Sequence, residues 1–78
     1  MPSDIKLQSI WVQYYSGYKT DEKPISFILD GNKFMVEKII DRWRSPEFEY
    51  FKVMADDGKG YLLKHDYTNA ESFLEKVF

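Results

Sequence analysis

Apolar and polar residues alternate along much of this chain, in short runs that end at turn-forming residues. The runs lie at about 7–15, 25–29, 33–43, 48–55 and 59–65. The alternation is clearest in the fourth run, where Phe51 and Val53 fall on one face and Tyr50 and Lys52 on the other. A two-residue period is typical of a β-strand with one buried face. Such segments at regular spacing predict a small antiparallel barrel or bent sheet.

Glycine and proline mark the ends of these runs. Asp30-Gly31 and Asp56-Asp57-Gly58 each lie between two β-rich segments. Such pairs favour hairpins, because glycine accepts the positive φ that tight turns need. Ser16-Gly17 ends the first segment and precedes a polar loop over 18–23, while Ser45-Pro46 breaks the chain after the third. These signals predict antiparallel neighbours joined by short connections.

The run at 33–43 admits two interpretations. A helix would group Met35, Ile39 and Ile40 at a 3.6-residue period. A strand would place every second side chain on a common face, namely Phe34, Val36, Lys38, Ile40 and Arg42. We favour the strand because the preceding Asp-Gly hairpin requires an antiparallel partner. A strand this long needs a bulge or bend to stay within a small barrel.

The C-terminal segment leaves a helix and a strand equally open. Thr68 or Asn69 would cap a helix, with Glu71 near the capping-box position. The run 73–78 would alternatively form a closing strand. The predicted fold is therefore mainly β, a five- to six-stranded SH3-like antiparallel barrel or bent sheet over residues 1–78, with or without a short C-terminal helix.

Composition limits how such a domain can be stabilised. The chain has 78 residues, no Cys and one His, so disulfides and thiolate zinc sites are excluded. Aromatic residues make up 18% of it, and each buried ring removes roughly 150–250 Å² from water. Packing of these rings must supply the core. The net charge of −2 argues against strong general attraction to nucleic acid.

Export and membrane signals are missing from the sequence. Residues 1–6 lack the basic and apolar regions of a signal peptide, and no apolar run approaches the ~20 residues that span a membrane. Together with the lack of Cys, this predicts a cytoplasmic protein.

Candidate catalytic chemistry is sparse. His65-Asp66 is the one His–carboxylate pair, and no serine lies in a nucleophile-elbow pattern near it. Asp56-Asp57 does not match the ligand spacing of a calcium loop, and no glycine-rich phosphate cradle occurs. We therefore predict no enzyme activity, no metal site and no cofactor.

Two clusters are candidates for binding. Arg42 and Arg44, the only arginines, flank Trp43, and Arg and Trp are common at binding hot spots. The competing interpretation is that Trp43 lies in the core and Arg42 pairs with a nearby carboxylate. The second cluster consists of Lys52, Lys59, Tyr61, Lys64 and His65, on the fourth and fifth segments. It suggests a platform for single-stranded nucleic acid, or else an ordinary solvated face.

The order Asp41-Arg42-Trp43-Arg44, Tyr50-Phe51-Lys52-Val53, Asp56-Asp57-Gly58, Tyr61-Leu62-Leu63 and Asp66 resembles a family of small uncharacterised bacterial proteins. The resemblance covers about residues 32–78 and implies a small β-barrel domain of unknown function. Some members are associated with translesion-polymerase-like proteins, which adds weight to a nucleic-acid role. The resemblance implies no catalytic residues for this chain.

The sequence thus predicts a non-enzymatic binding module, with a protein partner as the first hypothesis. The alternative is a nucleic-acid-binding accessory domain in DNA repair or replication, and no membrane partner is expected. The predicted contact surface comprises Arg42, Trp43, Arg44, Tyr50, Lys52, Tyr61 and Lys64.

Overall fold

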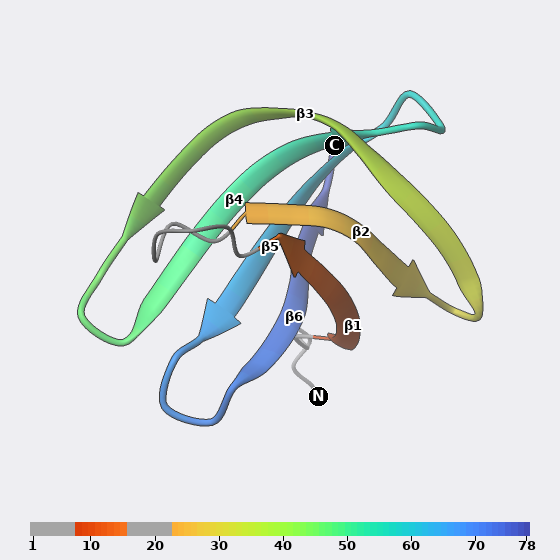
Figure 1. Cartoon of the computed structure of the whole chain (residues 1–78). Coiled ribbons are helices and arrows are strands. Elements are labelled where there is room, and N and C mark those ends of the chain that lie inside the picture. The colour runs from red at the N-terminus through yellow and green to blue at the C-terminus, as the bar shows by residue number, and fades with distance from the viewer. Residues whose placement is uncertain (1–7, 16–22) are drawn as a thin grey trace, which may run out of the picture.

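The computed structural model describes residues 8–15 and 23–78, and its regular structure is entirely β (Figure 1). The strands are β1 (Gln8–Tyr15), β2 (Lys23–Leu29), β3 (Asn32–Arg44), β4 (Phe48–Ala55), β5 (Gly60–Asp66) and β6 (Glu71–Val77). The turn predicted at Ser16-Gly17 and the loop predicted from Tyr18 lie outside the described residues, apart from Lys23, which begins β2. No helix that could cross a membrane is present in 8–15 or 23–78.

The six strands close into an antiparallel barrel. Each strand pairs with the next along the chain, and β1 also pairs with β6, where Ile10 faces Ser72. The predicted mainly-β barrel is confirmed in its six-stranded form. The C-terminal segment is the closing strand β6, so the helix alternative is wrong.

The predicted hairpins form, with the glycines in the expected conformation. Asp30 and Gly31 have φ angles of 53° and 81° between the paired residues Leu29 and Asn32, as in a two-residue type I′ turn. Gly58, with φ of 84°, donates its N–H to Ala55 O at 3.0 Å in the β4–β5 connection. These turns set the register of the strands that follow them.

Asp66 explains why the segment after β5 turns back instead of starting a helix. Its Oδ1 accepts the backbone N–H groups of Thr68 and Asn69 at 2.9 and 3.3 Å. The Asn69 side chain donates to Oδ2 at 3.1 Å, and Ala70 has φ of 54°. The carboxylate therefore closes a tight turn that sends the chain into β6.

Two register shifts in β3 change which of its side chains face the core. They lie between Val36 and Lys38 and between Ile39 and Asp41, where β3 pairs with β4. Each extra residue reverses the alternation. The predicted need for a bulge is confirmed, but the predicted common face is wrong: Val36 and Ile39 pack on the core, while Lys38 lies opposite Met54 on the outside.

The core lies between the inner faces of the strands. Its members are Val12, Phe27, Phe51, Val53, Ala55, Tyr61, Leu63 and Leu74. The rings of Phe27 and Tyr61 meet edge to face, with centroids 4.9 Å apart. In β4, buried Phe51 and Val53 alternate with half-exposed Tyr50 and Lys52, as the sequence predicts. This alternation positions one set of side chains on the outside of the barrel.

Candidate functional site

The outside of β3–β6 carries a continuous set of rings and lysines. In the pairing register, Trp43 of β3, Tyr50 of β4, Lys64 of β5 and Phe73 of β6 form one row across the four strands. Cross-strand partners share a face, so these side chains are neighbours. We define the outer face as Lys38, Asp41, Trp43, Phe48, Tyr50, Lys52, Met54, Leu62, Lys64, Asp66, Glu71, Phe73, Lys76 and Phe78.

Rings and ammonium groups alternate on this outer face. Trp43 is 45% exposed, and its ring stacks on Tyr50 with centroids 5.5 Å apart and an interplanar angle of 11°. Lys64 Nζ lies 4.1 Å from the Phe48 ring centroid and 5.8 Å from that of Tyr50. The Lys64 ammonium group is therefore held near two rings by cation–π contacts.

Phe78 provides a second centre of the same kind. Lys52 Nζ and Lys76 Nζ lie 4.5 and 5.4 Å from its ring centroid. Its backbone N–H donates to Gly60 O at 2.7 Å, and a Cβ at Gly60 would come within 3.3 Å of the Phe78 Cβ. Glycine at this position thus leaves the space in which Phe78 docks.

The outer face has a charge opposite to that of the chain. It holds four lysines, namely Lys38, Lys52, Lys64 and Lys76, against three carboxylates, namely Asp41, Asp66 and Glu71. The bulge residues Glu37, Ile40 and Glu75 have no partner in the register and are not counted on it. The whole sequence has a formal charge of −2. Asp66 and Glu71 form one row with Phe48, so the face has a small excess of positive charge, and three of its lysines lie beside rings.

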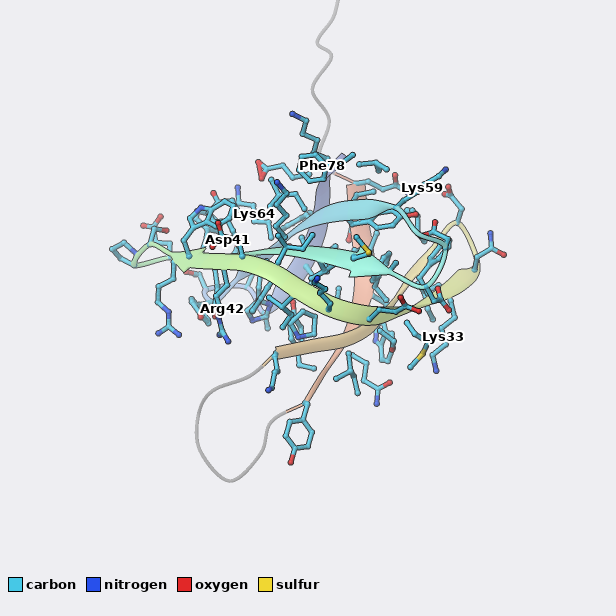
Figure 2. The ribbon with its side chains drawn as sticks, turned by 90° about the horizontal axis from the view of Figure 1, so that it is seen from above. Lys33, Asp41, Arg42, Lys59, Lys64 and Phe78 are labelled. Atoms are coloured by element: carbon cyan, nitrogen blue, oxygen red, sulfur yellow. The ribbon has the colours of Figure 1, made fainter. Side chains whose placement is uncertain are left out.

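Arg42 points to the other side of the sheet. Figure 2 shows Lys64 and Phe78 on one side of the strands and Arg42 on the other. Arg42 Nε and Nη2 donate to Glu49 Oε2 at 3.2 and 2.6 Å, and its guanidinium lies 4.9 Å from the Phe51 ring centroid. It therefore closes the end of the core.

Glu49 is a buried carboxylate at this end of the barrel. Its residue exposure is 4%, and it also accepts a hydrogen bond from the Tyr67 hydroxyl. Burial alone would raise its pKa, but the hydrogen bonds from Tyr67 and Arg42 outweigh burial and hold the pKa of Glu49 below its ordinary value of 4.5. Glu49 is thus ionised at neutral pH and anchors Arg42.

The structure divides the predicted surface residues between the outer face, the opposite face and, for Tyr61, the core. Trp43, Tyr50, Lys52 and Lys64 come together on the outer face. Arg42 and Arg44 pair with Phe51 and Glu49, residues of the opposite face, because neighbouring residues of a strand point to opposite sides.

Tyr61 is not a surface residue, contrary to the prediction. It is 3% exposed, and its hydroxyl donates to Asp57 Oδ2 at 2.6 Å. Burial, together with that hydrogen bond, raises the pKa of Tyr61 to about 12. The alternation with Leu63 already places it on the core face.

Several residues of the outer face were missed from the sequence. They are Lys38, Phe48, Phe73, Lys76 and Phe78. The alternation of β4 marks Phe48 as a neighbour of Tyr50. The others depend on the β3 bulges and on the conformation of the C-terminal segment, which the sequence left open.

The side chains of His65 and Asp66 make their hydrogen bonds to other residues. His65 Nδ1 lies 3.3 Å from Ser72 Oγ, which in turn is 2.8 Å from the Tyr14 hydroxyl. These three residues line part of a groove of about 490 Å³ between β1 and β6. Within 8–15 and 23–78, no cluster of three or more His, Asp or Glu residues is arranged to hold a metal ion.

No family model, curated protein or solved structure matches this chain. The resemblance to small bacterial β-barrel proteins therefore stays a prediction.

Proposed function

We propose that the protein is a non-enzymatic module that binds single-stranded nucleic acid through its outer face. The observation that carries the proposal is the row of Trp43, Tyr50, Lys64 and Phe73, in which one exposed ring and two partly exposed rings lie beside an ammonium group on the outside of the barrel. Unpaired bases stack on such rings, and lysines attract the phosphates between them.

The charge distribution also favours the outer face. Four lysines and three carboxylates share the outer face, a formal charge of +1, in a chain whose formal charge is −2. The remaining residues therefore carry a formal charge of −3, which would favour this face over the rest of the surface for a nucleic acid. Duplex DNA hides its bases in the stack, so the exposed rings favour a single strand.

A protein partner is the second candidate, and the same face offers support for it. Trp43 and Phe78 are about half exposed, and aromatic rings are common at the centres of protein interfaces. An interface centred on rings would depend little on salt, whereas phosphate binding would weaken steeply as salt rises. The salt dependence therefore separates the two candidates.

The test is a fluorescence titration with a short oligothymidylate. Trp11 and Trp43 are the two tryptophans, and Trp11 lies on β1, outside the outer face, so Trp11→Phe leaves Trp43 as the reporter. We expect saturable quenching, and four phosphate contacts would give a salt slope of about −3. If the oligothymidylate does not bind at low salt, the nucleic-acid proposal is overturned and the protein partner becomes the first candidate.

Matched variants locate the contact. Stacking contributes about 1–3 kcal/mol per base, so Trp43→Ala should weaken binding roughly 5- to 150-fold. Trp11→Ala is the control, since Trp11 is also more than half exposed but belongs to another surface. Followed by oligonucleotide anisotropy, equal losses in the two variants would contradict the assignment of the outer face.

A further inference from the structure

The rim of the barrel holds a pocket that shares Trp43 with the outer face. The pocket has a volume of about 400 Å³ and is lined by Arg42, Trp43, Arg44 and Glu49. It lies where β3 ends and β4 begins. One of its walls is therefore the residue that carries the proposed stacking ring.

Of the two arginines in this pocket, Arg42 is hydrogen-bonded to Glu49 and Arg44 is not. The two Glu49 oxygens are engaged, Oε1 by Tyr67 and Oε2 by Arg42. Arg44 Nη2 is 3.7 Å from Oε2, beyond hydrogen-bonding distance, and the Arg44 side chain is 60% exposed. Within 8–15 and 23–78, Glu49 is the only carboxylate in ion-pair range of Arg44.

The chemistry of Arg44 selects the ligand. A guanidinium presents several N–H donors in a planar fork that matches the oxygens of a phosphate or carboxylate. Glu49 is close enough to attract the guanidinium toward the pocket but too far away to satisfy its donors. An incoming oxyanion would thus find a positioned cation whose hydrogen bonds are not yet made.

We propose that this rim pocket binds an oxyanion, and that in the bound nucleic acid the oxyanion is the phosphate of the nucleotide stacked on Trp43. The identity of the phosphate rests on the proposed function, and Trp43 and Arg44 line the same pocket. The pocket would then fix the position of the strand on the outer face, while the rings hold the bases.

The first experiment compares the salt slopes of two variants with equal charge change. Arg44→Gln and Lys59→Gln each remove one positive charge, and Lys59 lies in the β4–β5 turn, away from Arg42 in Figure 2. In oligothymidylate titrations Arg44→Gln should reduce the magnitude of the slope by about 0.7, the value for one contact to a single strand. Lys59→Gln should leave it unchanged. Equal slopes in the two variants would overturn the phosphate assignment but leave the proposed function intact.

The second experiment tests the pocket without nucleic acid. Inorganic phosphate is added to the unmodified protein, and the Arg44 Nε–H resonance is followed by NMR. Acetate in a parallel titration distinguishes a phosphate site from one for any carboxylate. A saturable shift of Arg44 supports the pocket even if no oligonucleotide binds, an outcome that would overturn only the proposed function. No shift with either anion would overturn the pocket.

Discussion

Replacing Glu49 with glutamine tests the charged cluster at the barrel end. The residue is almost fully buried, and its two oxygens accept hydrogen bonds from Arg42 and Tyr67. Glutamine has nearly the same shape but one acceptor oxygen in place of two. Either Arg42 or Tyr67 would then face an amide NH₂ group, and the charge-assisted bond to Arg42 would be lost.

The expected cost of this change is about 2 kcal/mol. Hydrogen bonds to charged groups contribute about 1.5–3 kcal/mol, and breaking a fully buried ion pair costs about 3–5 kcal/mol. The Arg42 side chain is 31% exposed, so water compensates part of the loss and the lower range applies. A domain of this size has a free energy of unfolding of roughly 4–12 kcal/mol, so this cost is a large fraction of the total. Because each kcal/mol lowers the Tm of such a domain by about 4–8 °C, the Tm of Glu49→Gln should fall by roughly 8–16 °C.

The difference in free energy of unfolding between the unmodified protein and Glu49→Gln should depend on pH. The folded pKa of Glu49 lies below its ordinary value of 4.5, so ionised Glu49 stabilises the fold above that pH. This contribution is lost as the pH falls through the folded pKa. Glutamine does not titrate, so the stabilities of the unmodified protein and of Glu49→Gln should converge as the solution is acidified.

Urea denaturation between pH 7 and pH 3 measures both effects. Glu47→Gln is the matched control, because Glu47 is an exposed glutamate in the adjacent turn. A Glu49→Gln variant that is no less stable than Glu47→Gln at neutral pH would refute the reasoning. So would a difference that stays constant as the pH falls.

Three further changes have expected outcomes in the same denaturation assay. Leu63→Ala should cost about 2–5 kcal/mol because Leu63 is fully buried, whereas Trp43→Ala should cost only about 1 kcal/mol, the value of its stacking on Tyr50. Gly58→Ala should cost about 1–2 kcal/mol, since Gly58 has a φ of 84°. Tyr61→Phe should cost about 1 kcal/mol through the lost hydrogen bond and should remove the tyrosine that ionises last, with a pKa of about 12, in an ultraviolet pH titration.

The strands and hairpins were predictable because their signals are local. The two-residue period of 48–55 marks the buried face of β4, and Asp30-Gly31 specifies a type I′ turn by itself. The bulges of β3 were predictable in kind but not in position. Their placement after Val36 and Ile39 follows from the register with β4, which is a tertiary property.

The C-terminal segment could not be decided from local signals. Its apolar residues fit either period, and Glu71 fits a capping box. The strand forms because the edges of β1 and β5 both need a partner, and because Asp66 captures the N–H groups of Thr68 and Asn69 in a turn. Tertiary pairing thus overrides an ambiguous local pattern.

The candidate surface was predicted only in part. The prediction treated residues that are neighbours in the sequence as if they were neighbours in space. Arg42, Trp43 and Arg44 are consecutive, but in a strand the middle residue points away from the other two. Strict use of the alternation would have separated Trp43 from both arginines, whereas its neighbours Tyr50 and Lys64 follow from the register of β3, β4 and β5. The Phe78 centre lies beyond sequence reasoning, because it forms only when β6 closes the barrel beside β5.

The most direct test of the outer face as a nucleic-acid interface is a nitrogen–proton NMR titration with oligothymidylate at low and moderate salt. The account predicts shifts concentrated on Trp43, Tyr50, Lys52, Lys64 and Phe73, and weaker shifts at the higher salt concentration. Shifts confined to β1 and β2, or no shifts at low salt, would contradict it.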